Sequence, residues 1–554
     1  MVGRVKKVWH ARHARLDRRV ALKLLALGGG AALLGACSAP APASSPAATN
    51  ASTGTAPAST GTSPASTATA APASQPRSGG TLRAGTLGDL PTLDGSWVAG
   101  ANTTAHIYDR LVEYDPKLNP IPMLAESWDV NKDWTQLKLN LRRGVQWHTG
   151  RQFTSDDVEW NFNRVKTDPK INGGGFQDLI APLSSMEKPD PNTLIVKADA
   201  PWPGAFDLFS LLNMIDPVTM QQPDGVQHPV GTGPFTFVEY VQGDHVTLKK
   251  NPSYWQTGKP YLDGLRFQIF TDPQALVTQL EAGALDVAYD PPFRDTARLR
   301  QDPQYQVLIN DNTGQRVVIL QQIKTDGPTS NKQFRQALQY AVNRQRVIDM
   351  VFLGMGSPGD LPFAPSSPAY DVDREHRYSF DLDRARALIA SSGLANPELD
   401  INYASTNTEF ALIAQILKSD LATIGVTLNL KPLDSVTATT TEFQAAYPGL
   451  FLGRSLYGQL HPSFMEGNPN FSDLVSWANF KSDELTQLTN AIVHETDPAK
   501  QPQAYAAWSD YLLDESWAVT LGASSPHTIA TRNVHGLHYN LDEMLQANDA
   551  WLDT

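Results

Sequence analysis

Apolar residues recur at two spacings in the body of the chain, and each spacing predicts one kind of element. Leu137, Leu139 and Leu141 alternate with polar residues, which is typical of a strand with one buried face. After Thr154 and Ser155 come two acidic residues and then apolar residues at helical spacing, which predicts a capped helix start. We expect this block to serve packing and capping rather than ligand binding.

Strands and helices alternate on both sides of Gln315, which indicates two α/β lobes, the second beginning near that residue. In the first lobe, Asp272 is expected to cap a helix that Gly283 ends. In the second, a single helical stripe is predicted from Phe334 to Ile348. The other expected elements are strands at 265–269, 285–289, 317–321, 399–403 and 426–430 and helices at 273–282 and 410–424.

The strands at 399–403 and 426–430, with the helix at 410–424 between them, form a βαβ unit. Such a unit is normally right-handed, and its ligands bind beyond the carboxyl ends of its strands. The loop from Ala404 to Asn407 is therefore expected near a cleft, and Asn407 is a candidate ligand-binding residue.

The N-terminal residues have the order of a secretory signal. A basic segment precedes an apolar run from Val20 to Ala36, and small residues follow it. The run contains Lys23 and is shorter than the roughly 20 apolar residues of a membrane-spanning helix. We therefore exclude residues 1–36 from the fold as a signal peptide, the alternative being a signal anchor that is not cleaved.

The chain has one cysteine, Cys37, directly after this run. Residues 34–37 resemble a bacterial lipobox, in which the cysteine carries a diacylglyceryl group and becomes the first residue of the mature protein. Asp17 to Lys23 also resemble a twin-arginine export motif. The alternative is that Cys37 is a small buried hydrophobic residue.

Composition and charge limit what the rest can do. From Ser38 to Gly80 the residues are mainly Ala, Ser, Thr, Pro and Gly, which predicts a disordered spacer. Without residues 1–36 the chain has 37 Lys and Arg against 56 Asp and Glu, a net charge near −19. This acidity argues against binding to nucleic acid or directly to anionic lipid. The absence of a second cysteine excludes disulfides and thiolate metal sites within the chain.

Motifs for catalysis or cofactor binding are not found. The twelve histidines show no zinc-ligand spacing, and neither a nucleophile elbow nor a phosphate-binding loop is present. Gly354 to Gly359 match a dinucleotide-binding pattern, but they follow a helix instead of a strand, so a turn is expected. His461 and Asp473 could form an acid–base pair, yet no nucleophile pattern accompanies them. We predict no catalytic residue, no metal and no cofactor.

Several segments carry a family resemblance. They are residues 79–83, 92–94, 107–115 and 124–130, the block 137–158, the segment 231–235 and the helical stretch 334–351. Together they resemble the family 5 extracytoplasmic solute-binding proteins, the peptide and nickel class of ABC importers. The resemblance covers essentially all of residues 79–545.

The resemblance implies an α/β, two-lobed periplasmic-binding-protein type II fold of the large cluster C type, with mixed sheets and an inserted subdomain in lobe 1. It also implies a monomer that delivers a small-molecule or peptide ligand to ABC permease subunits in the membrane. This protein is expected to be exported and to be anchored to the outer face of the cytoplasmic membrane or to lie in the periplasm. The expected divisions are 1–36 (signal peptide), 37–80 (lipidated Cys37 and linker), 79–118 (lobe 1), 119–228 (inserted subdomain), 229–314 (lobe 1), 315–522 (lobe 2) and 523–554 (return to lobe 1).

One segment of lobe 2 bears on the ligand. In peptide-binding relatives it carries an aspartate that pairs with the free amino group of the peptide. Here no acid lies between Glu442 and Glu466, and a buried ammonium without a carboxylate costs several kcal/mol. An ordinary free-amine peptide is therefore disfavoured, and an oligosaccharide, modified peptide, opine-like derivative or metal chelate stays open.

The resemblance also implies the ligand-binding residues, for which surface-loop or packing roles are the alternatives. They are Trp97, Val98, Ala99 and Gly100 in lobe 1 and Arg454, Ser455, Tyr457, Gln459 and His461 in lobe 2. The polar members can hydrogen-bond an uncharged solute, and Arg454 can bind a carboxylate. The function implied is solute capture for import, with an exported lipoprotein hydrolase or a ligand sensor as alternatives.

Overall fold

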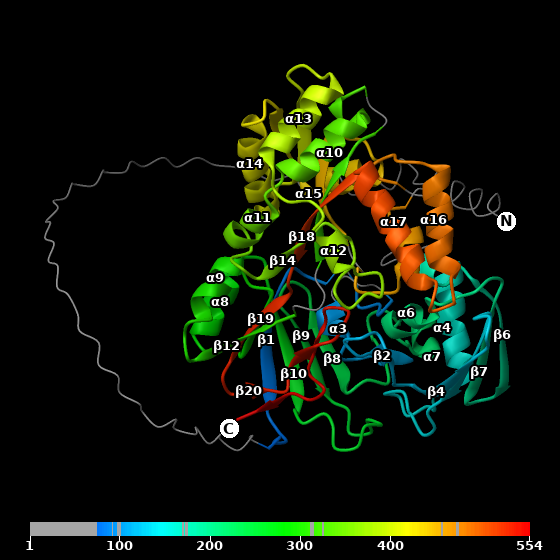
Figure 1. Ribbon diagram of the computed structural model, residues 1–554. Coiled ribbons are helices and arrows are strands. Elements are labelled where there is room, and N and C mark those ends of the chain that lie inside the picture. The colour runs from blue at the N-terminus through cyan, green and yellow to red at the C-terminus, as the bar shows by residue number, and fades with distance from the viewer. Residues whose placement is uncertain are drawn as a thin grey trace, which may run out of the picture. The chain divides into compact units, whose positions relative to one another are not determined.

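The computed structural model describes residues 75–90, 92–96, 101–168, 171, 176–310, 315–323, 326–455, 458–472 and 476–553 (Figure 1). The predicted signal peptide, Cys37 and most of the linker lie outside these residues, as do Trp97, Val98, Ala99, Gly100 and Tyr457. From Pro76 onward the chain forms one unit by its contacts, built on three large sheets.

The seven-stranded sheet consists, in order across it, of β12 (Tyr305–Ile309), β19 (His527–Thr531), β11 (Val287–Tyr289), β1 (Thr81–Leu87), β10 (Gly264–Phe270), β9 (His245–Lys250) and β8 (Phe235–Val241). Strand β1 is parallel to β10 and β11 on either side, and the outer strands pair antiparallel, so the sheet is mixed. The predicted strand–helix–strand unit is confirmed as β10, α8 (Pro273–Glu281) and β11. Asp272 caps α8, and Gly283 follows it with a φ of +71°.

The four-stranded antiparallel sheet consists of β4 (Ala125–Val130), β5 (Gln136–Leu141), β7 (Thr193–Ala198) and β6 (Leu183–Asp190). Its core includes residues of α4 (Ser155–Thr167), α5 (Phe176–Leu179) and α6 (Ala205–Leu211). The predicted alternation is confirmed, because Leu137, Leu139 and Leu141 are all buried in this core. The predicted helix start is also confirmed: Asp157 of α4 accepts a hydrogen bond from Thr154 N at 2.9 Å, as in a capping box.

The six-stranded sheet consists of β14 (Gly356–Pro358), β18 (Ala518–Ser524), β13 (Gln315–Gln321), β17 (Leu450–Ser455), β15 (Glu398–Ala404) and β16 (Thr427–Leu433). One core contains α10 (Lys332–Ala341), α11 (Arg344–Met350), α13 (Leu382–Ser392) and α14 (Thr408–Ala422). Another contains α15 (Ser435–Phe443), α16 (Asp483–His494) and α17 (Gln501–Glu515). Alternate β13 residues enter the two cores, so helices cover both faces. The predicted βαβ unit is confirmed by the parallel pairing of β15 with β16, which α14 connects.

The predicted helical stripe from Phe334 to Ile348 is broken in the structure. Val342 is extended, with φ −93° and ψ 116°, and separates α10 from α11. Asn343 then caps α11 by accepting a hydrogen bond from Arg346 N at 3.0 Å. The apolar spacing continues across the break because both helices contribute to the same core, so periodicity alone does not reveal it.

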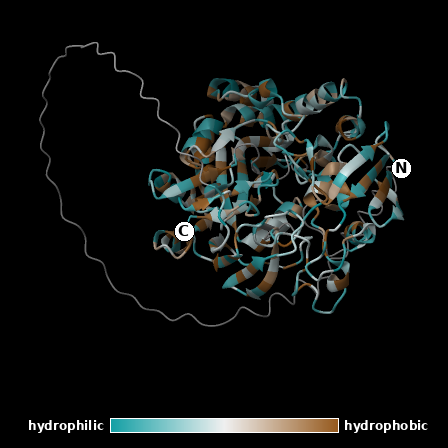
Figure 2. Cartoon of the chain, turned by 90° about the horizontal axis from the view of Figure 1, so that it is seen from below, coloured by the Kyte–Doolittle hydropathy of each residue, from teal (hydrophilic) through white to brown (hydrophobic). Residues whose placement is uncertain are grey.

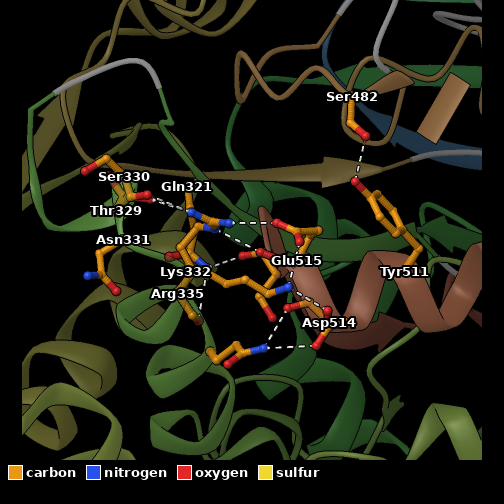
Figure 3. A network of polar contacts seen from close by, with 12 residues as sticks. Gln321, Thr329, Ser330, Asn331, Lys332, Arg335, Ser482, Tyr511, Asp514 and Glu515 are labelled. Carbon is orange, nitrogen blue, oxygen red and sulfur yellow. Dashed lines mark hydrogen bonds and ion pairs between the residues drawn. The ribbon is translucent and has the colours of Figure 1, made fainter. Parts of the chain in front are cut away.

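A polar network fastens α10 to the end of α17 (Figure 3). Lys332 Nζ lies 2.6 Å from carboxylate oxygens of both Asp514 and Glu515. Arg335, which is buried, donates to the backbone oxygen of Glu515 at 2.8 Å, and Gln321 donates to Ser516 O at 2.5 Å. Arg335 and Gln321 thus donate to backbone oxygens at the carboxyl end of α17, where the helix itself provides no donor.

Shorter elements complete the described chain. They are β2 (Val112–Tyr114), β3 (Pro120–Pro122), β20 (Val534–His535), β21 (His538–Tyr539), β22 (Leu545–Gln546), β23 (Trp551–Leu552), α3 (Ala101–Thr104), α7 (Pro217–Met220), α9 (Phe293–Leu299), α12 (Val372–Glu375), η1 (Pro328–Ser330) and η2 (Pro462–Glu466). Hydrophobic and hydrophilic residues are interspersed along the strands and helices (Figure 2). Among the described helices, none combines the length and apolar character of a membrane span.

An ion pair that involves the six-stranded sheet is buried. Arg316 of β13 and Glu375 of α12 are 1% and 2% exposed, and their Nη1 and Oε1 atoms are 2.9 Å apart. Glu375 Oε2 also accepts a hydrogen bond from Leu361 N. Burial raises the pKa of Glu375, and the charge of Arg316 opposes the rise.

We predict that Arg316→Met lowers the free energy of unfolding by about 3–5 kcal/mol, because Glu375 is left buried without its cation. The double variant Arg316→Met/Glu375→Gln keeps an acceptor for Leu361 N without the charge and should recover most of the loss. Urea denaturation of the three proteins measures both effects. Equal losses in the single and double variants would contradict the prediction.

Candidate ligand-binding site

Three parallel strands define one edge of the six-stranded sheet. Strand β15 pairs parallel with β16 and β17, so their carboxyl ends lie at the same edge. The first residues of β13 and the last of β18 lie there too, since Gln315 pairs with Ser524 and Arg316 with Ser455. The chain passes between the six- and seven-stranded sheets from β12 to β13 and from β18 to β19. The edge with the carboxyl ends is therefore the edge at which the two sheets are connected.

Three predicted residues lie at this edge. Asn407 is half-buried and caps α14 by accepting a hydrogen bond from Phe410 N at 3.0 Å. The guanidinium of Arg454 lies 5.7 Å from the centre of the Phe410 ring, so the structure brings Asn407 and Arg454 to one place. Ser455 is buried, and its hydroxyl accepts a hydrogen bond from Asn468 at 3.1 Å.

Gln459 and His461 lie in a loop that contacts the part of the chain containing the four-stranded sheet. His461 N donates to Asp207 Oδ2 at 3.1 Å, and the imidazole Nδ1 is 2.9 Å from the Ser463 hydroxyl. Burial lowers the pKa of His461 to about 4, so its ring is neutral at pH 7. Gln459 is 2% exposed. Ligand contact by these two residues stays a prediction.

The same loop is packed as well as hydrogen-bonded. Leu460 and Phe464 belong to the hydrophobic core of the four-stranded sheet. Beside them is a cavity of about 30 Å³, which residues such as Trp202 line from one side and Ser463 from the other. This space holds about two water molecules and is too small for a solute.

Asp207 is the residue of this contact that sequence reasoning missed. It is fully buried on α6 and also accepts a hydrogen bond from the Tyr114 hydroxyl at 2.9 Å. Burial raises the pKa of Asp207 to about 7, against the lowering effect of its hydrogen bonds from Tyr114 and His461. Its partner His461 is 254 residues away in the sequence. The available signal was a single acid within the apolar run 205–211.

The segment 97–100, which is the ligand-binding wall predicted in lobe 1, lies outside the described residues, but the residues on either side of it are described. Arg164 of α4 forms an ion pair with Asp94 and donates to the Ser96 hydroxyl at 2.8 Å. On the other side, Asn102 accepts a hydrogen bond from Leu545 N. Both ends of the segment 97–100 are thus held by other parts of the chain. Within the described residues, no three His, Cys, Asp or Glu side chains gather as a metal site.

The family model of the bacterial extracellular solute-binding proteins, family 5 (middle region), matches residues 119–468, more than half of the chain. The chain belongs to this family. It has the α/β fold of the family 5 solute-binding proteins, with mixed sheets, and it is the non-enzymatic solute-binding component of an ABC importer.

Similar proteins match this family 5 protein over more than half of its length. The heme-binding protein A of Haemophilus influenzae is 30% identical over 381 residues, which are 62% of this chain and 68% of that protein. The dipeptide-binding protein of Escherichia coli K12 is 30% identical over 58% of this chain and 65% of its own length. The structure of the oligopeptide-binding protein AppA of Bacillus subtilis with a nonapeptide matches with a TM-score of 0.72 at 19% identity, covering 87% of this chain and all of that one.

Asp207 generates a pH prediction. Between about pH 4 and pH 7 the folded protein holds a proton on Asp207 that the unfolded chain has released, so this residue's contribution to stability falls as pH rises. Asp207→Asn is neutral throughout, can accept from His461 N, and can donate to the Tyr114 oxygen. Its advantage in free energy of unfolding over the wild type should grow across this window towards about 4 kcal/mol.

Urea denaturation of both proteins at pH 5, 6, 7 and 8 checks this expectation. The exposed Asp156→Asn serves as the control and should show a constant difference from the wild type. Parallel pH profiles for Asp207→Asn and the wild type would show that the buried acid does not titrate in this range.

Proposed function

We propose that this family 5 protein is a lipid-anchored receptor that captures a small polar solute between lobe 1 and lobe 2 and passes it to its permease. The observation that carries the proposal is the position of the edge formed by β15, β16 and β17, beside both connections between the sheets. Bending at two adjacent connections brings that edge towards the opposite lobe, and a ligand that contacts both sides stabilises the closed form.

The proposed cleft has a wall from each lobe. From lobe 2 it takes Asn407, Arg454, Ser455, Tyr457, Gln459 and His461, and from lobe 1 the segment Trp97, Val98, Ala99 and Gly100. Two similar proteins are named as binders of heme and of dipeptides. For this chain we propose a peptide-like compound, an oligosaccharide or another polar solute. The lobes follow the expected divisions at 119, 229, 315 and 523, and the receptor works as a monomer.

The anchor is proposed from the sequence alone. Cleavage before Cys37 leaves a cysteine with two acyl chains, and two chains suffice for stable membrane attachment. The spacer up to Gly80 then holds the body away from the membrane. Export by the twin-arginine route is proposed from Arg18 and Arg19.

A thermal-shift screen of residues 76–554 tests solute binding. A ligand at about 100 times its Kd should raise the free energy of unfolding by roughly 2.7 kcal/mol. Arg454→Met should reduce the shift for the best ligand if that ligand is anionic, whereas Arg532→Met, in the exposed turn after β19, should leave it unchanged. The recovered solute should be chemically intact. Its conversion to a product would instead support the hydrolase alternative.

Cys37→Ser tests the anchor. In cells that express the full chain, the wild type should fractionate with membranes and be released by detergent. The variant has no thiol to acylate and should be soluble or retain its signal peptide. Metabolic labelling with a fatty acid separates these cases from simple adhesion, because label on the variant would contradict the proposal.

A further inference from the structure

A two-residue connection joins the six-stranded sheet to the seven-stranded sheet. Strand β18 ends at Ser524 and β19 begins at His527, so Ser525 and Pro526 form the whole connection. Pro526 O accepts a hydrogen bond from Asn310 N at 3.0 Å, and Asn310 follows β12 at the start of the other connection. The two connections therefore touch, and bending between the sheets involves the residues around Ser525.

His527 is buried directly after this connection. Its side chain is 1% exposed, with Nδ1 3.2 Å from Ser525 O and Nε2 2.7 Å from Pro291 O. Pro291 belongs to the segment between β11 and α9. The imidazole therefore lies between the connection and the segment that leads into α9.

Both atoms that face the ring nitrogens are carbonyl oxygens, and this limits which form of the ring fits. A carbonyl oxygen only accepts hydrogen bonds, whereas a neutral imidazole has one N–H and one bare nitrogen. In either neutral tautomer, one nitrogen lone pair therefore faces an oxygen lone pair in a buried site, where such a mismatch is costly. The imidazolium has two N–H groups and satisfies both oxygens at once. The geometry fits the charged ring better than either neutral form.

Two side chains beside the ring add to this preference. The ring of Phe293, in α9, is 4.5 Å from the imidazole between ring centres, and an aromatic ring attracts a cation at that distance. Asp290 Oδ1 is 3.7 Å from Nδ1 of His527. The Asp290 side chain is 80% exposed, so water and salt screen its charge and the two carbonyls contribute more.

The other titratable groups of the neighbouring elements do not oppose it. Tyr539 hydrogen-bonds to Thr528, the next residue of β19, and stays uncharged because burial raises its pKa. On α9, Arg294 is exposed, and Asp295 is paired with Arg298 of the same helix.

The same contacts extend to the core of the six-stranded sheet. Phe293 packs against that core, and its ring centre is 5.2 Å from that of Phe352, which belongs to it. Asp290 has a φ of +46°, which is uncommon for a residue other than glycine, and its N–H donates to His527 O at 3.1 Å. Such conformations are frequent where a chain switches between states. His527 therefore links β19, α9 and the helices of the other sheet.

We propose that His527 is a pH-sensitive brace of the connection between the two large sheets. When protonated, its ring donates to Ser525 O and Pro291 O and holds the connection against the segment before α9. When neutral, it releases one of these oxygens, and the connection bends more freely. Histidine suits this role because its charge changes between pH 5 and 8. The inference rests on the proposed function in that the protein bends at these connections, and it is independent of the solute.

Spin labels measure this bending, because residues 76–554 contain no cysteine. Lys249→Cys in β9 and Lys418→Cys in α14 place exposed labels on the seven-stranded sheet and on a helix of the six-stranded sheet. Without added solute, pulsed electron spin resonance should give a narrower distribution of label distances at pH 5 than at pH 8. In His527→Gln this pH difference should be lost, and the exposed His228→Gln should keep it. The comparison is repeated with Asp207→Asn, which removes the other titration near a contact of the cleft.

A second variant and a second readout keep the test independent of misfolding. Asp290→Asn removes an exposed charge and tolerates the left-handed backbone, so the fold should be kept. Its transition in label distance should move to lower pH, because the charged ring loses a favourable neighbour. In nitrogen-labelled protein, NMR should show two hydrogen-bonded ring N–H signals from His527 at pH 5 and one at pH 8.

The outcomes separate this inference from the proposed function. Equal label distributions at pH 5 and pH 8 in the wild type, or an equal change in His527→Gln, would overturn the brace and leave solute capture standing. A single ring N–H signal at both pH values would also overturn it. One narrow label distance at every pH, unchanged by any solute that gives a thermal shift, would count against both.

Discussion

The parallel pairing of β15 with β16 and β17 is the constraint on which the rest of the six-stranded sheet and its connections depend. It sends three carboxyl ends to one edge of the sheet and gives each end a different continuation. After β15 the chain caps α14 with Asn407, after β16 it enters α15, and β17 ends at Ser455. The central antiparallel strand β13 then connects this edge to the other large sheet. Position in the fold, more than any single motif, places polar groups together here.

Buried charges in this protein fall into two kinds. Arg316 with Glu375 and Arg164 with Asp94 are ion pairs, and each fastens segments that are distant in the sequence. Asp207 and Glu442 have no cation among the described residues, and burial raises the pKa of both. Asp207 accepts hydrogen bonds from two uncharged donors, the Tyr114 hydroxyl and His461 N, and so joins segments that are distant in the sequence. Glu442 has no such donor among the described residues.

The sequence predicted the elements that depend on local physical chemistry. Leucine alternation in β5, the cap at Thr154, the cap at Asp272 and the βαβ unit around α14 all follow from short-range preferences, and all are confirmed. The break at Asn343 was missed, because both helices feed one core and the apolar spacing does not change there. The contact of Asp207 was missed for a different reason. Its partner His461 is brought close only by tertiary folding, and no local pattern in the sequence indicates that contact.

The two apolar side chains of the 460–464 loop have a consequence for the resting protein. Withdrawing Leu460 and Phe464 from the core of the four-stranded sheet exposes both, at about 1.5–3 kcal/mol each. Together these costs reduce the population of any state in which the loop is detached by a factor on the order of 10² to 10⁴. The ligand-free protein therefore samples wide separation at this contact only rarely. Opening of the proposed cleft then requires motion that leaves these two side chains packed, so this contact limits how far the two walls can move apart.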